Sequence, residues 1–168
     1  MAATKKIMAW SKCSIEIGKT AENDAMASSL TSIGVIKDKS SSLEASEGDA
    51  LEAKMTGGVT VAREPSEGSF TLTTRVIEPT TELLVLLGLA EASGGSGDVN
   101  VKTHVVAEDW SVKLTPKNVG ARGIKAPKTS ITYLPGWSEE EGRYADMTFT
   151  ILQGEAGYWY SEFVKQAE

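Results

Sequence analysis

The sequence predicts a mainly β fold, a β-sandwich or partly closed barrel with one short flanking α-helix. Apolar and polar residues alternate along many short segments, the spacing of half-buried strands. These segments are rich in Val, Ile and Thr, whose β-branched side chains suit pleated sheet, and Gly or Pro separates them. A single segment has helical spacing instead. Many short strands with one helix are typical of this fold class.

Length and composition indicate one domain over residues 1–168. The chain has 168 residues, of which 40% are hydrophobic and 24% are charged, ordinary values for a globular protein with its own core. The sequence has no internal repeat and no obvious linker between domains. We therefore expect a single β domain with an exposed loop at about 37–48.

The first half of the chain supplies several expected strands. Alternation predicts strands over 11–18, more weakly over 30–36, and over 69–77. Residues 49–55 and 59–64 flank Thr56-Gly57-Gly58, a turn that favours a hairpin because Gly tolerates positive φ. Residues 37–48 are Ser-rich and charged, which predicts the exposed loop.

The helix is expected over Pro79–Leu87. Pro79 suits the start of a helix, and Leu83, Leu86 and Leu87 follow at helical spacing, with Gly88 as a terminator. This leucine stripe should cover a sheet or a neighbouring subunit.

The second half resumes with strands after a Gly/Ser connector over 92–98. We expect strands over 99–105, 110–114, 128–134, 143–152 and 158–164. The segment 115–127 contains two prolines and two glycines and is expected to be irregular.

No pattern in the sequence indicates catalysis, a metal or a cofactor. His104, the single histidine, should face solvent, and Cys13 lies in an apolar alternation that favours burial over reactivity. The acidic residues between Glu44 and Glu52 lack aromatic neighbours that would stack a sugar. We therefore expect no enzyme, no cofactor and no metal, with a hydrolase ranked last among the alternatives.

The charge balance and hydropathy restrict the partners. A formal net charge of −6 disfavours a general nucleic-acid binder, which needs a basic footprint. The apolar run at residues 7–10 is too short for a signal-peptide core, and no run reaches membrane-spanning length. We expect no membrane association.

Charge is segregated along the chain. Charged residues from Glu44 to Glu52 are all acidic, including Glu47 and Asp49, whereas those from Lys113 to Lys128 are all basic. Two solvated loops would explain this equally well. The alternative is that unlike surfaces meet on neighbouring copies, and the basic candidates for such contacts are Lys117, Arg122 and Lys125.

Two segments resemble a known family. Trp10-Ser11-Lys12-Cys13-Ser14-Ile15-Glu16-Ile17-Gly18 is one, and the other runs from Ala62-Arg63-Glu64 to Arg75-Val76-Ile77-Glu78-Pro79-Thr80. Both are similar to tail tube proteins of phages and prophages from Bacteroides-type bacteria, and the order of elements resembles that of tail tubes over nearly the whole chain. Type VI secretion tube proteins share this architecture.

The resemblance implies a structural subunit of the virion tail. Such subunits form homo-hexameric rings that stack into a hollow tube, assemble in the host cytoplasm with other tail proteins, and let DNA pass without sequence-specific binding. The family brings no catalytic residues. The alternative from another class is a monomeric virion-associated module, immunoglobulin-like or carbohydrate-binding.

Overall fold

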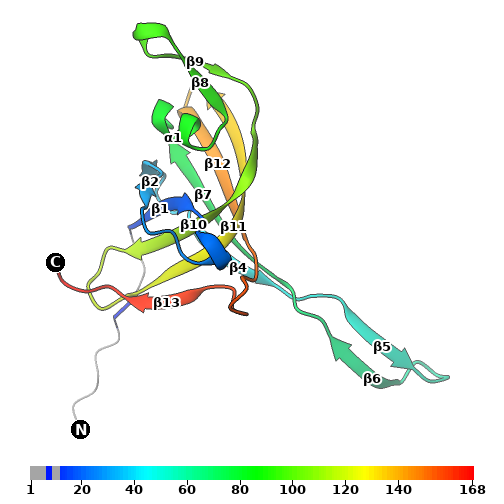
Figure 1. Cartoon of the computed structure of the whole chain (residues 1–168). Helices are drawn as coiled ribbons and strands as arrows, with labels where there is room; N and C mark the ends of the chain where they lie inside the picture. Colours follow the sequence, from blue (N-terminus) through cyan, green and yellow to red (C-terminus); the bar gives the residue numbers. More distant parts are fainter. Residues whose placement is uncertain (1–6, 9–11) are drawn as a thin grey trace.

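The computed structural model describes residues 7–8 and 12–168 of the chain. The protein is mainly β, with a strongly curled, partly closed sheet and one short helix (Figure 1). The elements, in chain order, are β1 (Cys13–Lys19), the 3-10 turn η1 (Glu22–Asp24), β2 (Thr31–Ser32), β3 (Val35–Ile36), β4 (Ser42–Ser46), β5 (Ala50–Lys54), β6 (Thr60–Pro65), β7 (Ser69–Ile77), α1 (Thr81–Leu86), β8 (Ala90–Ser93), the 3-10 turn η2 (Gly94–Ser96), β9 (Asp98–Val101), β10 (Val105–Pro116), β11 (Arg122–Ser138), β12 (Gly142–Ile151) and β13 (Ser161–Val164).

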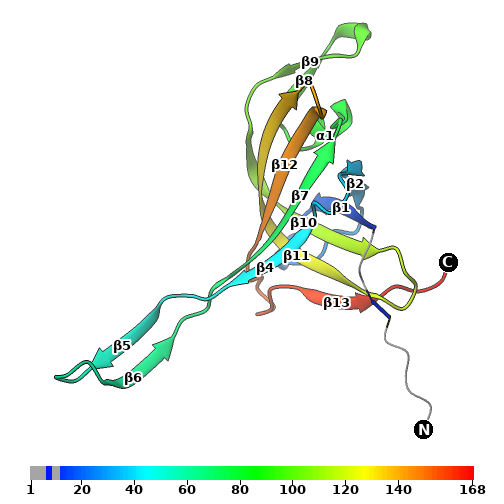
Figure 2. The same ribbon diagram turned by 180° about the vertical axis from the view of Figure 1, so that it is seen from behind.

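One nine-stranded sheet forms the body of the molecule. Its main path runs β2-β1-β10-β11-β12-β7-β3, while β4 also pairs with β7 and β13 also pairs with β11. All of these pairings are antiparallel. Two separate ribbons leave the body, β5-β6 on one side and β8-β9 near the helix (Figures 1 and 2).

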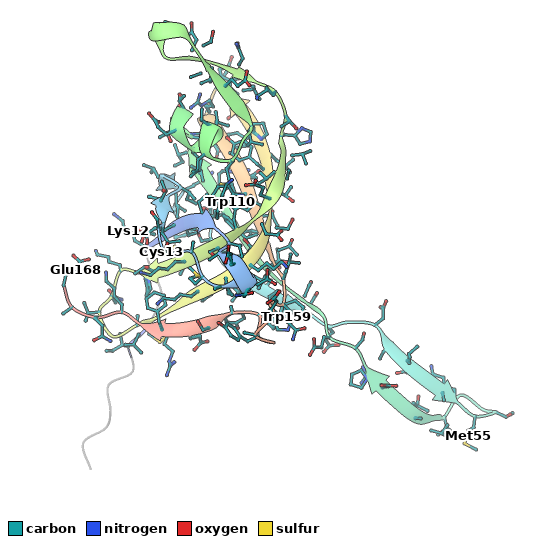
Figure 3. All side chains as sticks on the ribbon, in the orientation of Figure 1. Lys12, Cys13, Met55, Trp110, Trp159 and Glu168 are labelled. Carbon is teal, nitrogen blue, oxygen red and sulfur yellow. The ribbon has the colours of Figure 1, made fainter. Side chains whose placement is uncertain are left out.

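The core lies on one face of this sheet, inside its curl. Leu72 and Val76 on β7 share that face with Thr74, and Ala145, Met147 and Phe149 meet them from β12. Trp110 on β10 is 1% exposed and belongs to the same core, within the body of the molecule (Figure 3). As expected, residues alternate along the strands, so that apolar side chains face inside and polar side chains lie on the opposite face.

The helix covers one end of this core. Thr80 caps it by accepting a 3.2 Å hydrogen bond from the Leu83 amide, and Gly88 ends it with a φ of 73°. Leu83 and Leu84 are buried, as is Leu87 at the C-cap. The predicted stripe is thus wrong at one position, because Leu86 is 36% exposed and Leu84 takes its place in the core.

Three other sequence expectations need correction. The loop expected over 37–48 contains β4, whose five residues pair with β7 in register from Ser42–Thr73 to Ser46–Ser69. The irregular segment expected over 115–127 is much shorter, because β10 ends at Pro116 and β11 begins at Arg122. The final strand begins at Ser161, three residues after the predicted start.

The first strand agrees with expectation where the structure describes it. Its predicted start at Ser11, and the Trp10 of the quoted resemblance, lie outside the described residues. From Cys13 onward β1 pairs with β10 in an unbroken register that ends at Lys19–Trp110.

Candidate assembly surfaces

The most conspicuous surface feature is a hairpin arm, defined here as residues 50–65. It consists of β5 and β6 and the tight turn between them, and it projects far from the body (Figures 1 and 2). Met55 marks its tip (Figure 3), where the amide of Met55 donates to the carbonyl of Val59 at 2.9 Å. Gly57 and Gly58 have φ values of 98° and 82°, the left-handed conformation that this turn requires.

The two faces of the arm differ in chemistry. On one face Glu52 lies 3.4 Å from Lys54 and 3.6 Å from Arg63, so the charges are paired there. On the other face Ala53 lies directly opposite Ala62, and Leu51 lies directly opposite Glu64. The arm therefore has a charged face, and its other face combines apolar side chains with Glu64.

Neither face of the arm is covered by the described part of the chain. Every residue from 51 to 67 is exposed, and Leu51 is 76% exposed. Met55, Val59 and Val61 are also more than half exposed. An isolated two-stranded hairpin is only marginally stable in water, and exposed apolar clusters mark interaction sites. The arm thus has the properties of a segment that docks onto a partner.

The acidic candidates gather where the arm leaves the body. Glu44 lies on β4 opposite Thr71, and Glu47 and Asp49 lie in the connection from β4 to β5. All three side chains belong to exposed residues. The structure therefore brings the acidic residues together, at the root of the arm and not in a loop of their own.

The basic candidates gather at the turn between β10 and β11, where several already have partners. Lys117 is exposed in the turn itself. The guanidinium of Arg122 lies 3.5 Å from Glu162. The ammonium of Lys125 lies 4.9 Å from the centre of the Phe163 ring, and that of Lys113 lies 5.3 Å from it, within cation–π range.

The acidic and basic surfaces lie on opposite sides of the molecule. In both views the arm extends to one side, and the β10–β11 turn extends to the other (Figures 1 and 2). Within one chain these surfaces cannot neutralise each other. On two suitably placed copies they could meet.

The helix offers less to a partner than the sequence indicates. Leu83 and Leu87 are 3% and 5% exposed and belong to the core, so they are not available for contacts between subunits. Leu86, together with Val85 at 45% exposed, forms the small apolar surface that the helix leaves open.

A charged network that sequence reasoning missed lies beside β7. Arg75 makes a two-pronged contact with Asp146, at 2.7 and 2.9 Å, and also reaches Glu141 at 2.7 Å. Lys37 donates to the same Glu141, and the Arg75 guanidinium stacks 4.2 Å from the centre of the Tyr144 ring. The hydrogen bond from Lys37 is the main reason that the pKa of Glu141 lies below its ordinary value, and nearby Arg75 adds to this. The pKa of Arg75 is raised, chiefly by its hydrogen bond to Asp146.

A shallow aromatic hollow lies near the root of the arm. Phe70 makes edge-to-face contacts with Trp159 and Tyr160, with ring centroids 5.7 and 5.3 Å apart. The remaining lining residues are Glu67, Gln153, Gly157, Tyr158 and Glu162, around a space of about 490 Å³. Trp159 lies close to the start of the arm (Figure 3).

The residues considered for chemistry lie apart from these surfaces. His104 is exposed between β9 and β10, and Cys13 is a half-buried free thiol at the start of β1. Over residues 7–8 and 12–168, no three His, Cys, Asp or Glu side chains form a metal-binding group. The helices in this part of the chain are also too short to span a membrane.

No protein-family model matches the chain, and no curated protein matches it.

Proposed function

We propose that this chain is the structural subunit of a phage tail tube. In this proposal the subunits form hexameric rings that stack into a hollow conduit for DNA, together with other tail proteins. The resemblance of the two sequence segments suggests this family, and the exposed hairpin arm is the observation that carries the proposal.

The arm favours assembly because its exposure is costly in a lone subunit. About 25 cal/mol is gained for each Å² of apolar surface removed from water, so docking of Leu51 and its exposed neighbours would stabilise both the arm and the contact. Natural proteins seldom leave a long hairpin with clustered apolar side chains uncovered. If the arm of each copy docks onto the next copy, every arm in the assembly is covered.

The positions of the charges favour contacts between different patches on neighbouring copies. A patch that meets a different patch on the next copy generates rings or filaments. Glu44, Glu47 and Asp49 belong to the root of the arm, on one side of the molecule, and Lys117 belongs to the β10–β11 turn, on the other side. The acidic surface of each copy can therefore contact the basic surface of the next, end to end or side by side, throughout a polymer.

Excision of the arm tests the proposal. The amide of Ser66 donates to the carbonyl of Asp49 at 3.2 Å, so the two ends of the arm already lie side by side. Residues 50–65 can therefore be replaced by an Asn-Gly turn that closes the shortened hairpin. We expect the body to melt as before while ring and tube formation is lost, as measured by thermal unfolding, light scattering and negative-stain microscopy.

The matched control retains the arm and alters only its charged face. Exchange of Glu52 and Arg63, by Glu52→Arg with Arg63→Glu, preserves their pairing and should preserve assembly. Normal tubes from the excised protein would contradict the role of the arm.

A second candidate function has one specific observation in its favour. The aromatic hollow at Phe70, Trp159 and Tyr160, with two carboxylates and Gln153 at its margin, has groups suited to stacking on a sugar and bonding its hydroxyls. A monomeric carbohydrate-binding module would remain monomeric at high concentration and would bind glycans. Loss of that binding in Trp159→Ala would establish this alternative instead.

A further inference from the structure

The face of the central sheet opposite the core is made of hydroxyl groups in register. Thr71 and Thr73 on β7 lie opposite Thr150 and Thr148 on β12. These in turn lie opposite Ser130 and Thr132 on β11. We call these six residues the hydroxyl face.

The hydroxyl face is accessible and nearly free of net charge. Ser130 and Thr132 are exposed, and the four threonines on β7 and β12 are half-buried by their neighbours. The next pair along β7 and β12 is Arg75 and Asp146, which neutralise each other in a close ion pair. A protein with 24% charged residues thus presents an ordered surface of three strands whose charges cancel.

One margin of this face is acidic, and the other carries an acidic residue paired with a lysine. Glu44 on β4 lies opposite Thr71. Asp109 on β10 lies opposite Ser130, and its carboxylate is 3.9 Å from the ammonium of Lys128. The concentrated basic groups are elsewhere, around Lys113, Lys125 and Phe163. A nucleic acid is a polyanion held mainly through cations, so a surface of hydroxyls with Glu44 at one margin and Lys128 already paired with carboxylates at the other offers it little affinity.

We infer that the hydroxyl face is the wall of the conduit, the surface along which nucleic acid moves without being retained. This inference rests on the proposed tube function and assigns which face of the subunit points inward. The surface around Lys113 and Lys125 faces elsewhere, because cations along a conduit would hold phosphates and impede transport. The opposite side of the subunit, with Val85 on α1, points away from the conduit.

Size-selective labelling of assembled tubes tests the assignment. Single cysteines are introduced as Ser130→Cys or Thr132→Cys, each in a Cys13→Ser background, with Val85→Cys as the matched outside position. The reagents are a small maleimide and the same maleimide carried on a large polyethylene glycol. The arm-excised protein supplies the unassembled reference for each position.

In tubes we expect both face positions to keep their reaction with the small reagent and lose their reaction with the large one. Val85→Cys should react with both, and every position should react with both reagents in the unassembled protein. Full reaction of Ser130→Cys and Thr132→Cys with the large reagent in intact tubes would overturn the assignment. Protection of Val85→Cys alone would overturn it too, by placing the opposite side inward.

The experiment distinguishes failure of this inference from failure of the proposed function. Failure of the unmodified protein to form tubes contradicts the tube proposal and removes the basis of the inference with it. Tubes with an accessible hydroxyl face contradict the inference alone. Ser130→Cys replaces one oxygen by sulfur, so a folded, assembling variant is expected even if Thr132→Cys perturbs the sheet.

Discussion

In the helix, the spacing of the leucines predicts some, but not all, of the residues that are buried. Helical spacing predicts Leu83 and Leu87 at the covered positions, and both are buried. It also predicts Leu86, which is exposed, because the helix has only six residues and its chain turns at Gly88. Leu84 and Leu89 fill the core instead, and Leu89 is fully buried. Over so short a helix the phase of the stripe depends on where the chain turns, which sequence spacing does not specify.

Two leucines in the same helix should therefore respond differently to truncation. Leu83→Ala removes a buried side chain and should lower the free energy of unfolding by about 2–5 kcal/mol. Leu86→Ala, at an exposed position, should lower it by about 0.5 kcal/mol or less. Urea denaturation of both variants measures the difference, and equal losses would show that the helix packs in another orientation.

The network around Glu141 predicts a dependence of stability on pH. Its carboxyl has a lowered pKa in the folded protein, so the folded state favours the ionised form. The resulting stabilisation is complete above the ordinary carboxyl pKa and is lost as pH falls through the lower, folded value. Protonation of Glu141 is the event that weakens its contacts with Lys37 and Arg75.

Glu141→Gln should reduce the loss of stability on acidification. We expect the variant to be less stable than the wild type near neutral pH and to approach it in acid, as followed by urea denaturation from roughly pH 7 to roughly pH 3. Glu140→Gln, at an exposed neighbour outside this network, serves as the control. A constant difference between Glu141→Gln and the wild type at every pH would show that the network does not couple to protonation.

At the scale of elements, local patterns identified most strands but not all of their partners. The alternation over 69–77 predicts β7 with the bounds that the structure has, and Thr56-Gly57-Gly58 correctly marks a hairpin turn. Neither pattern indicates that β5 and β6 leave the body as a free arm. Which sheet a strand joins depends on contacts between residues far apart in sequence, and periodicity contains no such information.

The segment over 37–48 shows the same limit. Its Ser-rich, charged composition favours a loop, yet Leu43 packs against the core and Ser42 lies within 3.1 Å of Thr73 through their hydroxyls. β4 lies at the edge of the sheet, where exposed polar side chains are tolerated and hide the strand pattern. Long-range pairing with β7 therefore outweighs the local composition.

Deletion of 40–46 should consequently destabilise the protein itself. The deletion removes β4 and the apolar contact of Leu43, so we expect a lower melting temperature and partial exposure of the core, in contrast to excision of the arm. Calorimetry of the two deletions side by side tests this. Unchanged melting after loss of 40–46 would mean that β4 contributes nothing to the folded body.

At the scale of the whole molecule, the structure joins a curled sheet to an uncovered arm and separates its acidic and basic surfaces. Sequence reasoning identified both charged segments and proposed that they meet between copies, and this remains a proposal. The sequence alone could not show where these two segments lie in the molecule, because the arm and the β10–β11 turn are separated only once the sheet is assembled. The fold class was predictable, whereas the position of the candidate assembly surfaces required the structure.

The central claim is that copies of this chain build a hollow tube. Negative-stain electron microscopy of the purified protein, over a wide range of concentration, tests this most directly. The proposal predicts rings of uniform diameter with a central opening, and stacks of these rings into tubes as concentration rises. Particles that stay the size of one chain at every concentration, with no rings or tubes, would contradict it.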